Sequence, residues 1–255
     1  MPQQLSRFLS APTEFHMKLA KRVLRYLAGT KHYSLVFGTN KNSTQPLKVY
    51  TDADWATDRN KRRSTTGIVV LYNGNIVAWA SKLQPSTAGS TAEAEYMALA
   101  AGMKEARWFR AWLKEVMSCG YNEIPLLNSK LNPAGTSPIV PLLMCDNQAA
   151  IAIANKGNAA APTAKHISIR CNQVQEEVAH GLVLVQWCPT DQQLADILTK
   201  PIATQQHNVL LPMLLHIKIP AGTLSVSTQV MLLLKMYTAM LVHQLVQTDQ
   251  VKQLI

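Results

Sequence analysis

The sequence contains few charged and aromatic residues, and it has no long apolar run. Charged residues make up 16% of its 255 positions and aromatic residues 6%. Its uninterrupted apolar stretches are far shorter than the roughly 20 residues of a membrane-spanning helix. The opening residues MPQQLSRFLSAPTEF also lack the apolar stretch of a secretory signal. We therefore expect neither a secretory signal nor a contact with a membrane.

Cysteine is scarce as well. The four cysteines, Cys119, Cys145, Cys171 and Cys188, are scattered, and no two of them form a CxxC pair. This spacing argues against a zinc knuckle and fits a reducing compartment, where isolated thiols mostly serve as small core residues. No Ser-His or Cys-His arrangement can be recognised either, so nothing in the sequence indicates a side-chain nucleophile.

Acidic residues are too few to balance the basic ones, and the imbalance is one-sided. The net charge is +10, and residues 1–114 carry 17 Lys and Arg against 7 Asp and Glu. Residues 115–255 carry 8 of each kind. A basic excess confined to one part of the chain suits a polyanion such as nucleic acid. A protein that is merely basic and soluble is the alternative.

Apolar spacing and turn residues predict a mixture of helices and strands. Pro12-Thr13-Glu14 predicts the start of a helix that ends near Gly29. Asn73-Gly74 predicts a hairpin turn. The predicted strands are 47–52, 66–72, 75–80, 139–145 and 182–187, and the further predicted helices are 90–116, 146–156, 164–180 and 189–199. Strand-helix alternation after a meander predicts a mixed sheet covered by helices.

Two segments are less regular. Residues 118–138 are rich in Gly, Asn, Ser and Pro and predict a loop. Residues 202–255 form an apolar tail, with a helix expected around 229–246 and no recognisable chemistry. A packing extension, an oligomerisation helix and non-native sequence from a shifted reading frame all remain open for this tail.

Four carboxylates fall where a sheet edge could gather them. Asp52 and Asp146 end predicted strands, whereas Glu95 and Asp196 lie in predicted helices. Clustered carboxylates repel one another, and divalent cations between them relieve the repulsion. Oxygen ligands favour Mg²⁺ or Mn²⁺, and two such ions would support in-line displacement at phosphorus. Taken singly, each acid is better explained as a helix cap or surface residue.

Five sequence blocks then carry a specific resemblance. In order they are VYTDADWATDRNKRRSTTG, AWASKLQPSTAGSTAEAEYMALA, MCDNQAAIAIA, AKHISIR and QLADILTKP, all within residues 48–201. They resemble the ribonuclease H domain of copia-type retrotransposons, and the opening segment resembles the end of the reverse transcriptase region. The resemblance implies three parts: a polymerase-end or connection segment over 1–46, a ribonuclease H-like domain over 47–201, and the tail over 202–255.

The resemblance also implies a fold, a site and cofactors. The fold would be α/β, a ribonuclease H-like mixed five-stranded sheet of three antiparallel and then two parallel strands, flanked by helices. Its catalytic and metal-binding acids would be Asp52, Glu95, Asp146 and Asp196, holding two Mg²⁺ or Mn²⁺ ions. Asp54 is not one of these four acids, but it shares a strand face with Asp52 and could assist it. The implied partners are an RNA–DNA hybrid, whose RNA strand is cut, and the polymerase region of the parent polyprotein.

Five further residues are candidates for binding the hybrid. Asn147 and Gln148 follow Asp146 and would donate to the minor groove, although ordinary helix-start roles are equally consistent. Arg62, Arg63 and Lys82 are candidate phosphate contacts, and a solvated charge run is nearly as good an explanation.

The sequence also departs from the family pattern. Ser168 stands at an acid position of the AKHISIR block, and no His occurs in CPTDQQ before the last acid. A proton shuttle by that route is therefore not supported, and the alternative is a catalytically inactive nucleic-acid-binding remnant of an element. An interaction module built on the apolar tail is a third hypothesis. By family analogy the compartment would be a cytoplasmic particle or the nucleus, and the sequence itself does not choose.

Overall fold

A computed structural model describes most of the chain. The described residues are 8–35, 45–58, 62–118, 139–155 and 165–215, together with Leu5 and Phe37. The chain divides into two compact units, one formed by Met1–Ser34 with Ile217–Ile255 and the other by Leu35–His216. The predicted loop at 118–138, apart from its first residue, and the predicted helix around 229–246 lie outside the described residues.

The first unit contains helix α2, Glu14–Gly29, as the sequence predicts. Thr13 caps it reciprocally with His16. The Thr13 side chain accepts a hydrogen bond from the His16 backbone, and the His16 ring accepts one from the Thr13 backbone N–H at 3.1 Å. This capping box satisfies two backbone donors that would otherwise lack partners. None of the helix residues is buried.

The second unit is built on a five-stranded mixed sheet of order β3-β2-β1-β4-β5. The strands are β1 Leu47–Asp54, β2 Thr65–Tyr72, β3 Asn75–Leu83, β4 Leu142–Cys145 and β5 Leu184–Trp187. β1, β2 and β3 pair antiparallel, whereas β4 pairs parallel with both β1 and β5. Asn73 and Gly74 have φ angles of 48° and 75°, which is the backbone that a tight hairpin turn requires. The predicted ribonuclease H-like sheet is confirmed.

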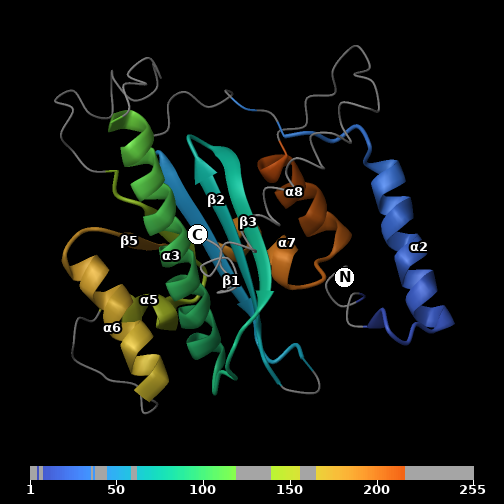
Figure 1. Cartoon of the computed structure of the whole chain (residues 1–255), viewed down its shortest axis with the longest axis horizontal. Helices are drawn as coiled ribbons and strands as arrows, with labels where there is room; N and C mark the ends of the chain where they lie inside the picture. Colours follow the sequence, from blue (N-terminus) through green and yellow to red (C-terminus); the bar gives the residue numbers. More distant parts are fainter. Residues whose placement is uncertain are drawn as a thin grey trace, which may run out of the picture. The chain divides into compact units, whose positions relative to one another are not determined.

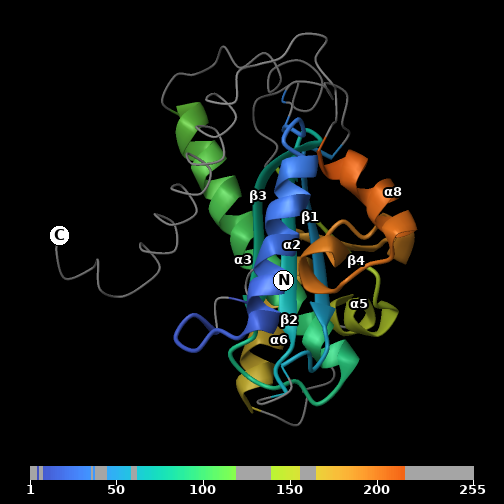
Figure 2. The same cartoon turned by 90° about the vertical axis from the view of Figure 1, so that its right-hand side faces the viewer.

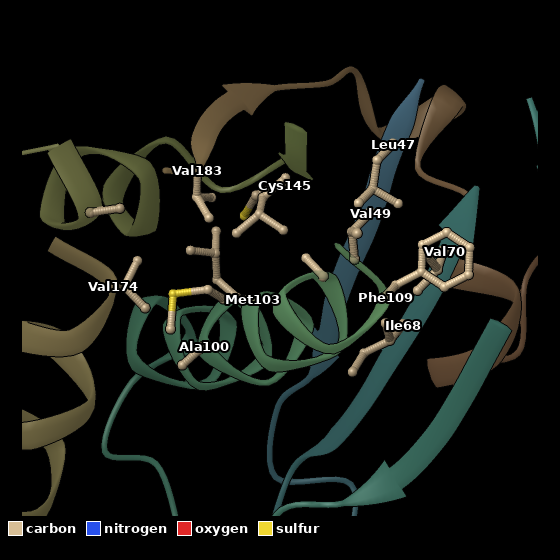
Figure 3. Packing of buried hydrophobic residues seen from close by; sticks show 14 of the residues in the cluster. Leu47, Val49, Ile68, Val70, Ala100, Met103, Phe109, Cys145, Val174 and Val183 are labelled. Carbon is tan, nitrogen blue, oxygen red and sulfur yellow. The ribbon is translucent and has the colours of Figure 1, made fainter. Parts of the chain in front are cut away.

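One face of the sheet is covered by helices α3 Thr91–Ser118, α5 Gln148–Asn155 and α6 Lys165–Ala179 (Figure 1). Figure 3 shows Val49 and Val70 of the strands on the side of Phe109 of α3, and Val174 of α6 beside Met103 of the same helix. Burying these large apolar side chains contributes most of the stabilisation of this layer, about 1.5–3 kcal/mol for each.

The opposite face is covered by α7 Asp196–Thr199 and α8 Thr204–Leu214 (Figure 2). A second apolar cluster joins Leu210 and Leu214 of α8 to Val69 and Leu71 of β2. The sequence did not predict α8, which lies in the segment assigned to the tail.

The single helix predicted over 189–199 is wrong as a continuous element. The segment instead forms a short 3₁₀ turn, η2 Thr190–Gln192, followed by the one-turn helix α7. The cause is Gln193, which is fully buried and uses its side chain in place of helical backbone bonds. Its Nε2 donates to the Thr51 carbonyl at 3.0 Å, and its Oε1 accepts from the Ala195 N–H at 3.3 Å. These bonds fix α7 against β1.

The alternation of β1 decides where its acidic residues point. Leu47 and Val49 belong to the cluster under α3, whereas Tyr50 packs with the cluster under α8. Asp52 lies two residues beyond Tyr50 and therefore faces the side of α7. Within the described part of the chain, no helix has the length and apolar character needed to cross a membrane.

Candidate active site

The structure brings all four predicted acids together at one edge of the sheet. Carboxylate oxygens of Asp52, Asp146 and Asp196 lie within 4.8 Å of one another, and Glu95, Cys145 and Asp146 form a second group of the same size. β1 carries Asp52, the end of β4 carries Asp146, and helices α3 and α7 carry Glu95 and Asp196. Asp146 belongs to both groups, so the four acids form one continuous cluster.

Burial makes this cluster electrostatically costly. Asp52, Glu95 and Asp196 are 1%, 7% and 0% exposed, and Asp146 is half-buried. Burial, with the nearby charges of Asp52 and Asp146, raises the pKa of Glu95 to about 9. Burial and Asp52 raise the pKa of Asp196 to about 6 and also raise that of Asp146. Ionising all four acids at once is therefore unfavourable in the folded chain unless a cation lies among them.

The positions of the carboxylate oxygens in the cluster are suited to hard divalent cations. The buried Glu95 Oε2 has no hydrogen-bond partner within the described residues. A buried carboxylate oxygen without a donor is expensive unless a cation or solvent satisfies it. Oxygen ligands at this spacing are the kind that Mg²⁺ and Mn²⁺ prefer. Asp52, Glu95, Asp146 and Asp196 can therefore hold metal.

Cys145 is the one sulfur within the described metal-ligand groups, and it is a poor candidate for a ligand. Burial strongly raises the pKa of its thiol, so the sulfur stays protonated. Its Sγ accepts a hydrogen bond from the Asn147 N–H at 3.4 Å. Cys145 is also part of the apolar cluster under α3. We therefore assign it to packing, which leaves an all-oxygen site.

Several residues of the site were not predicted from the sequence. The Thr199 hydroxyl donates to Asp52 Oδ2, and the Lys200 ammonium lies 2.9 Å from Asp196 Oδ1 and 3.6 Å from Asp52 Oδ1. Thr199 and Lys200 follow Asp196 by three and four residues, which is the spacing of one helix face. That spacing was the sequence signal that could have identified both residues.

Two further contacts hold the cluster from outside α7. The Gln206 amide of α8 donates to Asp196 Oδ2 at 3.3 Å, and the Thr190 hydroxyl donates to Asp146 Oδ2 at 3.2 Å. Gln206 lies ten residues beyond Asp196 in the predicted tail, and no local pattern distinguishes it. Contacts of this kind depend on the tertiary fold.

Two acids next to the predicted ligands, Asp54 and Glu93, behave differently from each other. Asp54 is partly buried on the same strand as Asp52, and burial together with Asp52 raises its pKa. Glu93 instead supports the start of α3, since its Oε2 accepts a hydrogen bond from the Gly89 N–H at 2.9 Å. Neither residue belongs to the two ligand groups found within the described residues.

The predicted nucleic-acid contacts lie at more exposed positions. Asn147 Oδ1 accepts a hydrogen bond from the Ala150 N–H at 3.0 Å and so caps α5. The next residue, Gln148, is exposed. Lys82 is exposed on β3. Arg62 is exposed with a left-handed φ of 53°, and Arg63 is partly buried.

Comparison with known proteins gives clear relatives, although no family model matches the chain. A retrovirus-related Pol polyprotein from transposon RE1 of Arabidopsis thaliana is 35% identical over 204 residues, covering 78% of this chain and 12% of the relative. The corresponding polyprotein from transposon TNT 1-94 of Nicotiana tabacum is 35% identical over 198 residues, covering 78% and 13%. The chain thus spans about an eighth of the length of these relatives.

Solved structures show a weaker likeness. LC11-RNase H1, isolated from compost by a metagenomic approach, is 15% identical and aligns with a TM-score of 0.39. The alignment covers 61% of this chain and 93% of that structure.

Proposed function

Because the chain belongs to the retrovirus-related Pol polyproteins of copia-type retrotransposons, we propose that it is their ribonuclease H part and hydrolyses the RNA strand of RNA–DNA hybrids. The observation that carries this proposal is the convergence of Asp52, Glu95, Asp146 and Asp196 in one buried cluster. A purely structural cluster would be expected to satisfy its buried oxygens with protein donors, and Glu95 Oε2 has none within the described residues.

The two overlapping ligand groups support two ions of Mg²⁺ or Mn²⁺. Asp52, Asp146 and Asp196 would hold one ion, and Glu95 with the shared Asp146 would hold the other. When bound, such a pair supplies charge stabilisation on both sides of the phosphorus and lowers the pKa of water. The protein residues fix the geometry, because Thr199, Thr190 and Gln206 each tie one carboxylate oxygen in place.

Substrate binding follows from the residues around the cluster. The Asn147 side chain uses its oxygen to cap α5, which leaves its amide nitrogen to donate to a 2′-hydroxyl in the minor groove. Gln148 is exposed beside it. Arg62, Arg63 and Lys82 would contact backbone phosphates. The basic excess of residues 1–114 supports binding of a polyanion.

The proposal also assigns a role to each part of the chain. Residues 47–201 would form the nuclease, and residues 1–46 would connect it to the polymerase region of a parent polyprotein. The segment after 201 contributes at least α8, whose Leu210 and Leu214 complete the apolar cluster under the sheet. Removing α8 would also remove Gln206 from Asp196.

The direct test uses the full chain with an RNA–DNA hybrid labelled on either strand. We expect cleavage of the RNA strand alone, with Mg²⁺ or Mn²⁺ present and not with EDTA. Duplex DNA of the same sequence should remain intact. Hybrid binding without any cleavage would instead identify a catalytically inactive nucleic-acid-binding remnant.

A further inference from the structure

Lys200 reaches directly into the acid cluster. It follows α7, and its backbone N–H donates to the Asp196 carbonyl at 3.2 Å, which holds the residue one helical turn beyond that acid. Its ammonium lies 2.9 Å from Asp196 Oδ1 and 3.6 Å from Asp52 Oδ1. The side chain is 34% exposed, whereas the side chains of Asp52 and Asp196 are 2% and 0% exposed.

The oxygens that Lys200 faces are the ones that a metal ion would need. Thr199 donates to Oδ2 of Asp52, and Gln206 donates to Oδ2 of Asp196. Each carboxylate therefore has one oxygen engaged by a neutral protein donor. The remaining oxygen, Oδ1 in both cases, points at the same ammonium. A cation bridging Asp52 and Asp196 must compete for these two atoms.

We propose that Lys200 occupies the place of a divalent cation between Asp52 and Asp196 in the metal-free chain, and that the ammonium must leave when a cation binds there. This inference rests on the proposed function only in taking the acids as metal ligands. An ammonium carries one charge and forms flexible hydrogen bonds, whereas Mg²⁺ or Mn²⁺ carries two charges and binds at shorter distances. The divalent ion therefore replaces the ammonium, and the partly exposed lysine stem lets the charge swing into solvent.

Lys200 is thus a positioning residue with two opposing effects. It neutralises buried carboxylates while no metal is bound, and so it stabilises the metal-free fold. The same contact weakens metal binding, because part of the interaction with the ion must first displace the lysine. Lys200→Met keeps the stem and removes the charge, and its soft thioether is a poor ligand for Mn²⁺. This variant should separate the two effects.

The experiment measures Mn²⁺ binding to the full chain by calorimetry, without nucleic acid. We expect Lys200→Met to bind Mn²⁺ about tenfold more tightly than the wild type. Lys200→Arg keeps a cation in place and should stay close to the wild-type affinity. Lys104→Met removes the same charge from an exposed position on α3 and is the matched control.

Thermal melting gives a second readout that is independent of calorimetry. Lys200→Met should melt at a lower temperature than the wild type in EDTA, and saturating Mn²⁺ should raise its melting temperature by a larger amount. Detectable Mn²⁺ binding by Lys200→Met alone would also support the inference.

Equal or weaker Mn²⁺ binding by Lys200→Met would overturn the inference, as would an equal gain in Lys104→Met. Either result leaves the nuclease proposal intact, since hybrid cleavage is measured separately. A chain that shows the expected Mn²⁺ affinities but never cuts a hybrid would refute the nuclease proposal alone. Absence of Mn²⁺ binding in both the wild type and Lys200→Met would refute both.

Discussion

Gly67 lies directly opposite Asp52 across the β1–β2 pairing, and α7 rests on it. A Cβ at Gly67 would stand 2.6 Å from Thr199 Cγ2 and 2.8 Å from the Ala195 carbonyl oxygen. Glycine is therefore the residue that lets the turn carrying Asp196 approach the strand carrying Asp52. The acid cluster depends on this close backbone contact.

Gly67→Ala should push α7 away from β1 and misplace Asp196. We expect the rate of hybrid cleavage to fall about 100-fold, because displacements near 1 Å have effects of that size. The free energy of unfolding should fall by about 1–3 kcal/mol, as in other overpacked sites. Gly29→Ala is the matched control, since a Cβ there meets nothing within 4 Å. Wild-type cleavage by Gly67→Ala would show that the close approach is dispensable.

The stability of the metal-free chain should fall as the pH rises. Burial and neighbouring acids raise the pKa of Glu95 from 4.5 to about 9, so the folded chain retains a proton that the unfolded chain releases. The folded state therefore binds more protons, and the free energy of unfolding decreases with pH across this window. Asp196 adds to the same trend below about pH 6.

Melting temperatures measured in EDTA from about pH 5 to about pH 9 check this prediction. Glu95→Gln should flatten the decline above pH 6, with Glu93→Gln as the matched control two residues earlier. Divalent cations should also flatten the decline, because they stabilise the ionised carboxylates. A melting temperature that rises across this range would contradict the assignment of a proton to Glu95.

Lys82 tests the nucleic-acid surface. If it contacts a phosphate, Lys82→Gln should weaken binding of hybrids of any sequence and lower the magnitude of the salt slope by about 1. Fluorescence anisotropy over a range of salt concentrations measures both quantities. Lys104→Gln removes an equivalent exposed charge from α3 and serves as the comparison. An unchanged salt slope in Lys82→Gln would place this lysine outside the interface.

Much of the fold was predictable because its signals are local. Asn73-Gly74 marked the hairpin, and the apolar spacing marked α3. The segment 189–199 failed because a buried side chain overrode the helical pattern: Gln193 bonds to Thr51, which lies far away in the sequence. The helix α8 was missed because its apolar residues are buried by contact with β2, which lies far away in the sequence.

The site divides in the same way. Asp52, Glu95, Asp146 and Asp196 were found through sequence blocks, and the fold places them together. Their hydrogen-bond partners were not found, because a hydroxyl or amide that orients a carboxylate resembles any polar surface residue in the sequence. Lys200 illustrates the difficulty: a lysine is usually solvated, and only the three-dimensional contact with two buried acids reveals its position.

The most direct measurement of the central claim compares Asp146→Asn with Asp191→Asn in metal-dependent cleavage of a labelled hybrid. Asp146 belongs to both ligand groups, whereas Asp191 is an exposed acid in the nearby turn η2. Asp146→Asn should abolish cleavage while the chain remains folded by circular dichroism, and Asp191→Asn should cut the RNA strand at the wild-type rate. Equal cleavage by the wild type and Asp146→Asn would contradict a nuclease centre built on these four carboxylates.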